Sequence, residues 1–112
     1  MLTKKDIIER KVFTEERLET LLENCKEWYS AYMDVKFNSA SMPLHVLEKT
    51  ARDRDSFKAS IYEMLPYNVT AIFDNTGVYP DKINFCVFFY NGGEHYLMEE
   101  FRVDALTGTI IS

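Results

Sequence analysis

The chain has 112 residues and a mass of 13.2 kDa; 46% of its residues are hydrophobic, 28% are charged, and its formal net charge is −5. This length fits a single domain spanning residues 1–112, and the hydrophobic content excludes a disordered chain. The acidic balance argues against nucleic-acid binding, because phosphate contacts require clustered Lys and Arg. The sequence contains no long apolar run, which argues against a membrane span.

The first ten residues alternate charged and apolar side chains and never build the uninterrupted apolar stretch of a signal peptide, which predicts a cytoplasmic protein. Cys25 and Cys86 stand in apolar patterns far apart in the sequence, without a C-x-x-C pair, so we expect two buried free thiols. His45 and His95 are isolated from other ligand-type residues, so we expect neither a metal nor another cofactor.

Residues 3–65 form the predicted helical half. Thr3 with Asp6 resembles a capping arrangement for a short helix, and Thr14 is a second candidate N-cap. From Thr14 a helix is predicted to run to about Met33, followed by a connector from Asp34 to Met42 with a possible extended piece over 35–37. The helix is indicated by apolar residues at steps of three and four: Leu18, Leu21, Leu22, Cys25, Trp28, Tyr29 and Tyr32.

A further helical segment is predicted between Pro43 and Leu65. Pro43 suits a first helical turn, Ser41 is a reasonable cap, and Pro66 ends the segment. The charged run over 52–56 is compatible with a kink or break. One helix or two therefore both remain open.

Residues 68–112 form the predicted strand half. Alternation over 68–74 predicts one strand, 82–104 reads as a long β-hairpin, and 109–112 is short enough for a terminal edge strand. Helices followed by strands predict an α+β fold, in which the N-terminal helices pack on one face of a three- to four-stranded antiparallel meander sheet.

The hairpin has two competing registers. A two-residue turn at Asn91-Gly92 would scatter apolar residues over both faces of the hairpin. A three-residue loop, with Gly93 in the left-handed position of a bulge, collects them on one face and is the register we predict. It pairs Ile83 with Phe101, Val87 with Leu97 and Phe88 with Tyr96.

Because strand residues alternate between faces, this register divides the hairpin into two surfaces. The core face comprises Ile83, Phe85, Val87, Phe89, Leu97, Phe101 and Val103, interrupted by His95 and Glu99. The mixed face comprises Asn84, Cys86, Phe88, Tyr90, Tyr96, Met98, Glu100, Arg102 and Asp104. Aromatic residues gather toward the turn on the mixed face and charges toward its far end, which is unusual for a surface that only meets water.

The sequence contains no recognised catalytic motif. It lacks a P-loop, a G-x-G-x-x-G, a G-x-S-x-G and an H-E-x-x-H. His95 and Glu99 on the core face could form an acid–base pair, but a solvated or structural role is the favoured interpretation. We therefore expect a protein that is not an enzyme.

The C-terminal end of the chain carries a family resemblance. The residues from Tyr96 to Ile110, which contain the run Val103-Asp104-Ala105-Leu106-Thr107-Gly108, resemble the last hairpin of PepSY-type and related small cystatin-like domains. The final strands of those domains often run as Val-Asp-Ala-x-Thr-Gly and then an apolar residue. The resemblance implies a helix packed on a curved antiparallel sheet, and a non-catalytic module for peptide binding or protease inhibition.

The mixed face is the predicted binding site. Aromatic and Met side chains are enriched at interface centres, so we expect contact with a protein partner or a second copy of the chain. The anchors would be Phe88, Tyr90, Tyr96 and Met98, with Glu100, Arg102 and Asp104 as a polar rim. The alternative is that the N-terminal segment or the second helix folds over this face and makes it part of the core.

Two other functional classes also fit. A long helix before an aromatic-rich sheet is similar to the small-ligand-binding fold of the nuclear-transport-factor-2 type, whose pocket is lined by aromatic side chains. A small acidic protein also fits an inhibitor, such as an immunity protein or a phage anti-defence protein.

Overall fold

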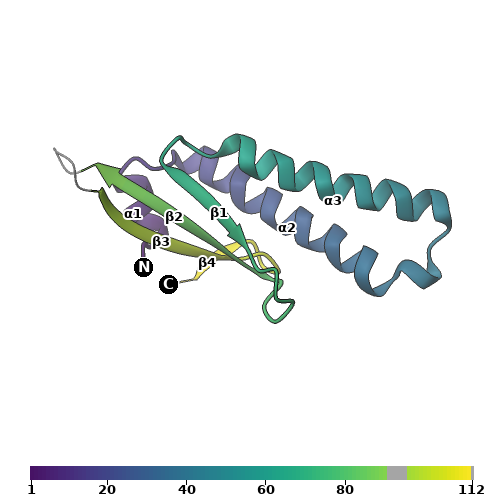
Figure 1. The fold of residues 1–112 in the computed structure, drawn as a ribbon. Helices are drawn as coiled ribbons and strands as arrows, with labels where there is room; N and C mark the ends of the chain where they lie inside the picture. Colours follow the sequence, from purple (N-terminus) through teal and green to yellow (C-terminus); the bar gives the residue numbers. More distant parts are fainter. Residues whose placement is uncertain (91–95, 112) are drawn as a thin grey trace.

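The structure is a computed structural model that describes residues 1–90 and 96–111, apart from the side chain of Tyr96. Helices come first and an antiparallel sheet follows, which confirms the predicted α+β fold (Figure 1). The helical elements are α1 (Lys4–Glu9), α2 (Glu15–Phe37), the 3-10 turn η1 (Ser39–Ser41) and α3 (Leu44–Met64). The strands are β1 (Val69–Phe73), β2 (Lys82–Tyr90), β3 (Tyr96–Asp104) and β4 (Thr109–Ile111), in the spatial order β1-β2-β3-β4.

Both predicted N-caps are present. The Thr3 hydroxyl accepts a hydrogen bond from the Asp6 backbone N–H at 3.1 Å, and the Thr3 N–H donates to the Asp6 carboxylate at 3.0 Å, which completes a capping box. The Thr14 hydroxyl accepts from the Arg17 N–H at 3.2 Å. These bonds satisfy backbone donors that have no partner in a first helical turn, and they set where α1 and α2 begin.

The predicted end of α2 and the cap of α3 are wrong. The helix passes Met33 and ends at Phe37, and the extended piece expected over 35–37 is its last turn. No Gly or Pro marks the end of α2 in the sequence. Asn38 is its C-cap: the Asn38 N–H donates to the Asp34 carbonyl, and the Asn38 side-chain amide donates to the Asp34 carboxylate. Ser41 belongs to η1, and the N-cap position of α3 is Pro43, without a side-chain hydrogen bond.

The segment predicted between Pro43 and Leu65, for which one helix or two remained open, is one helix, α3. Its charged run causes no break, because the positions between Arg52 and Ser56 are exposed or half-buried and Lys49 pairs with Asp53 one turn on, at 3.0 Å. Helical neighbours four residues apart stabilise a helix modestly in this way. Helix α3 ends before Pro66, as the sequence predicted.

The hairpin register differs from the predicted one by two residues. Phe88 pairs with Met98 instead of Tyr96, and Val87 pairs with Glu99 instead of Leu97. Five residues separate β2 from β3, not three, and the bulge predicted at Gly93 lies outside the described residues. A shift of two keeps every side chain on its face, because strand side chains alternate with a period of two, so the core face and the mixed face are as predicted.

The observed register pairs buried residues at the helix-covered end of the hairpin. Phe85 lies opposite Phe101, and their rings stack with centroids 4.8 Å apart. Ile83 lies opposite Val103, and all four of these side chains are fully buried. Leu97, opposite Phe89 toward the other end of the core face, is 52% exposed.

Helices α2 and α3 form an arm that extends beyond the sheet, which gives the molecule its elongated shape of 55 × 28 × 24 Å (Figure 1). The buried residues of α2 stop at Ala31, and those of α3 comprise Ile61 alone. Phe37 and Leu44, near the tip of the arm, are exposed. Within the described residues, the outer part of the arm, beyond Ala31 in α2 and before Ile61 in α3, therefore contains no buried side chain. No helix in the described ranges is long and apolar enough to cross a membrane.

Candidate functional site

Helices cover the core face of the sheet, and among the described residues no helix lies on the mixed face (Figure 1). The ring of Phe13 meets Phe101 edge-on at 6.5 Å, and the α2 side chain Trp28 meets Phe73 at 4.8 Å. The α3 side chain Tyr62 also meets Phe73, at 5.7 Å. Phe73 pairs with Ile83 and Phe101 with Phe85, so all these contacts are on the core face.

The N-terminal segment lies beside the sheet. The Leu2 N–H donates to the carbonyl oxygen of Glu100 in β3 at 2.9 Å, next to the short pairing of β3 with β4. Leu2 is buried in the same core cluster as Ile7 of α1. The segment therefore extends the β4 side of β3 and then turns toward the core face.

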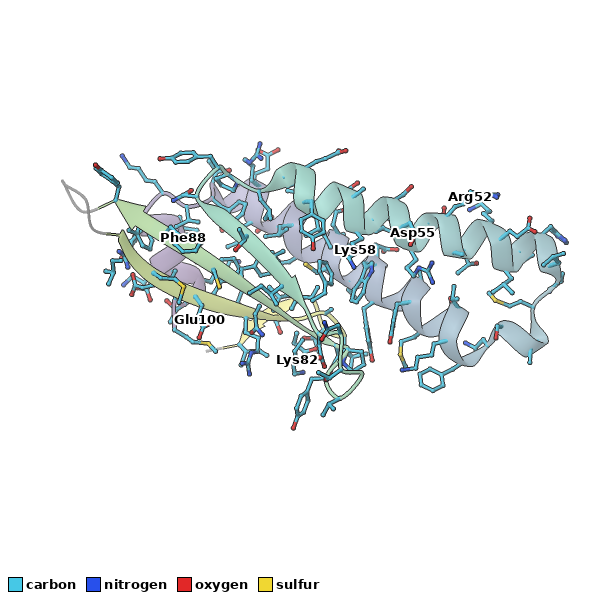
Figure 2. The ribbon with its side chains drawn as sticks, in the orientation of Figure 1. Arg52, Asp55, Lys58, Lys82, Phe88 and Glu100 are labelled. Carbon is cyan, nitrogen blue, oxygen red and sulfur yellow. The ribbon has the colours of Figure 1, made fainter. Side chains whose placement is uncertain are left out.

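The predicted binding residues share the mixed face and differ in exposure. Tyr90 is 65% exposed and Met98 is 56% exposed, while Phe88, directly opposite Met98, is half-buried. Glu100 is exposed and Arg102 is half-buried; Figure 2 shows Phe88 on β2 and Glu100 on β3. The backbone of Tyr96 pairs with Tyr90, which places Tyr96 in register with this face, and its side chain lies outside the description.

Lys82 and Asp104, at the far end of the mixed face, form a charge cluster with Asp81. Lys82 donates to the carboxylate of Asp81 at 2.9 Å and lies 3.3 Å from that of Asp104. The hydrogen bond to Asp81 raises the pKa of Lys82, with a further contribution from Asp104, and the same bond lowers the pKa of Asp81. This cluster holds the start of β2 to the end of β3.

A hollow of about 690 Å³ adjoins this cluster, where the loop 74–81 curls beside the mixed face. Its apolar lining includes Ile72 of β1 with Val78 and Tyr79 of the loop, and its polar lining includes Asn84 and Arg102. The sequence alone did not predict a binding site at this hollow. The available signal was two adjacent apolar residues, Val78 and Tyr79, in an otherwise polar loop.

A second hollow, of about 470 Å³, lies between α2, α3 and the same loop. Trp28 and Phe73 form part of its floor, and the Lys58 ammonium lies 4.5 Å above the ring of Phe73. Figure 2 shows Lys58 and Asp55 on α3. Aromatic side chains of the kind expected to line a ligand pocket are in contact with one another here, because Trp28 and Tyr62 both pack against Phe73.

The His95 and Glu99 pair is only partly described, because His95 lies outside the described residues. Glu99 forms an ion pair with Arg10, whose guanidinium lies 3.7 Å above the ring of Phe89. These contacts hold the segment after α1 on the core face, which is a structural role for Glu99. Among the described residues no group of three His, Cys, Asp or Glu is arranged to hold a metal ion.

The two cysteines are free and buried, as the sequence predicted. Burial raises the pKa of the Cys25 thiol to about 12, because an apolar environment disfavours the thiolate. A thiol in this state is a poor nucleophile at neutral pH.

Comparison of the chain with protein-family models, with curated proteins and with solved structures finds no match in any of the three. The resemblance to PepSY-type and cystatin-like domains therefore stays a prediction.

Proposed function

We propose that this chain is a non-catalytic protein-binding module that acts through the mixed face of β2 and β3. The observation that carries the proposal is the pair of exposed apolar side chains, Tyr90 and Met98, on a sheet face without a helix. On a soluble protein, large exposed apolar side chains that gather on one surface usually mark an interaction site.

Phe88, Tyr90 and Met98 would supply the apolar anchors, and Tyr96 belongs to the same set by its register. Glu100 is the exposed charge next to them and would contribute to a polar rim with Arg102. A rim of this kind sets orientation and excludes wrong partners more than it adds affinity. The partner is a foreign protein or a second copy of the chain.

An inhibitory role is the more specific form of this proposal. The resemblance of the residues from Tyr96 to Ile110 to PepSY-type and cystatin-like domains implies peptide binding or protease inhibition, and an inhibitor acts by covering its target with a surface. Immunity and anti-defence proteins belong to the same class. The small-ligand alternative of the nuclear-transport-factor-2 type receives less support, because the core-face rings of Phe85 and Phe101 are fully buried and stack on each other instead of surrounding a pocket.

Met98→Glu tests the binding face with little risk to the fold, because Met98 is already more than half exposed. We expect the circular-dichroism melting temperature to stay within a few degrees and self-association, read by native mass spectrometry, or partner recovery, read by quantitative crosslinking, to be lost. Leu106→Glu, at an apolar position 60% exposed in the β3–β4 turn, is the matched control and retains both. Phe88→Glu repeats the test at Phe88, the residue directly opposite Met98.

Three outcomes are distinguishable. If Met98→Glu unfolds the chain, the mixed face is part of the core. If Met98→Glu stays folded and keeps every wild-type association, the mixed face is not the contact surface and the proposal fails. A stable dimer that disappears in Met98→Glu but not in Leu106→Glu identifies the partner as a second copy.

A further inference from the structure

The hollow beside the loop 74–81 has an apolar wall that the chain leaves exposed. Ile72, Val78 and Tyr79 are 51%, 65% and 63% exposed, although each lines the same concavity. Ile72 reaches it from the mixed face, because it pairs with Asn84. Three such side chains around one concavity provide an apolar surface on which a ligand can pack.

Arg102 is the one cation of the described lining that has no carboxylate partner among the described residues. Its Nε donates to the side-chain oxygen of Asn84 at 2.7 Å, and it takes part in none of the ion pairs. Lys82, in the same lining, is held by two carboxylates. The Asn84 bond uses one of the five guanidinium N–H groups and orients the plane, so the terminal nitrogens remain for a ligand.

The loop wall is held in place by one carboxylate. Asp74 accepts from the backbone N–H of Thr76 at 2.8 Å, from the Thr76 hydroxyl at 2.6 Å and from the Tyr79 N–H at 2.6 Å. These bonds lower the pKa of Asp74, the bond from the Thr76 hydroxyl contributing most. They position Val78 and Tyr79 before any ligand arrives, and Figure 2 shows Lys82 where this loop enters β2.

We propose that this hollow binds a small organic carboxylate with an apolar body. The carboxylate would accept from the terminal nitrogens of Arg102, since a guanidinium fork matches its two oxygens, and the apolar body would lie on Ile72, Val78 and Tyr79. The volume, about 690 Å³, is in the range of small-molecule sites. Because the chain carries a net charge of −5, capture depends on this local guanidinium and not on the overall field.

This inference goes beyond the proposed protein-binding role and does not rest on it. A titration of the isolated chain reads the hollow directly. The probe is 4-phenylbutyrate, followed by amide chemical shifts in 15N-labelled protein at low ionic strength, with 4-phenylbutyramide and butyrate as matched probes that lack the charge and the ring. We expect saturable shifts at Ile72, Val78, Tyr79 and Asn84 with 4-phenylbutyrate, and roughly ten-fold weaker binding of either matched probe.

Arg102→Gln removes the charge and keeps a polar side chain, and we expect it to weaken 4-phenylbutyrate binding roughly ten-fold. Arg52→Gln makes the same charge change on an exposed arginine of α3 and should leave binding unaltered. Equal binding of the acid and the amide, equal binding by Arg102→Gln, or no saturable shifts at the hollow would each overturn the proposal. The acid-to-amide comparison uses the unaltered chain, so it decides even if Arg102→Gln fails to fold.

Discussion

Phe101→Ala against Met98→Ala is the sharpest test of which face of β3 the fold depends on. The Phe101 side chain is fully buried, stacks on Phe85 at 4.8 Å and meets Phe13 edge-on at 6.5 Å. Truncating a buried Phe to Ala removes about 3–5 kcal/mol of folding free energy, and aromatic pairs add roughly 0.5–1.5 kcal/mol each. We therefore expect a loss near the upper end, about 4–5 kcal/mol.

Met98→Ala changes a side chain of the same strand that is 56% exposed on the mixed face. Substitutions of this kind usually change the free energy of unfolding by less than about 0.5–1 kcal/mol. Both variants truncate a large apolar side chain of β3 to Ala, one on each face, so the difference between their losses reports which face the fold depends on.

Urea unfolding followed by far-UV circular dichroism measures both losses. With an m-value of about 1.5 kcal/mol per molar, a loss of about 4 kcal/mol lowers the midpoint by roughly 2.5 M urea, whereas Met98→Ala should move it by less than about 0.7 M. Comparable losses for the two variants would refute the assignment of Phe101 to the core face and Met98 to the surface.

Three further outcomes are expected. Cys25 should not react with a thiol reagent at pH 8 until the chain unfolds. Because burial raises the pKa of its thiol from 9.0 to about 12, the contribution of Cys25 to stability should fall as pH rises from 9 to 12. Cys25→Ala should therefore make the urea midpoint fall less steeply over that pH range, and an unchanged slope would contradict this. Hydrogen exchange in the arm, at 32–37 and 44–56, should be at least roughly ten-fold faster than in 18–28, since the arm lacks fully buried residues, and equal protection would contradict this. Thr14→Ala should cost about 1 kcal/mol in urea unfolding through the lost cap, whereas Ser30→Ala, at an exposed site within α2, should be neutral or slightly stabilising.

The two faces of the hairpin could be predicted because alternation is a local property of a strand. Val87 and Phe88 point to opposite sides whatever β2 pairs with, and the helix caps at Thr3 and Thr14 depend on residues only three positions away. The apolar stripe of α2 likewise repeats within a turn or two. Each of these features needs no knowledge of distant parts of the chain.

The hairpin register, the length of α2 and the hollow needed the tertiary structure. The pairing of Phe85 with Phe101 depends on how the core closes under α2, and both registers that differ by two keep the same faces, so alternation could not separate them. The hollow brings Ile72 and Tyr79 together with Arg102, which is distant from both in sequence and reaches them because β1, β2 and β3 are neighbours.

The α+β order, the starts of α1 and α2 and the face on which each strand side chain lies could all be predicted from the sequence, because local hydrogen bonding and periodicity decide these properties. The tertiary structure was needed to show that α1, α2 and α3 all meet the core face and that no helix of the described residues lies on the mixed face. The reason is that coverage of a sheet depends on where a helix returns in space, which is set by long-range packing.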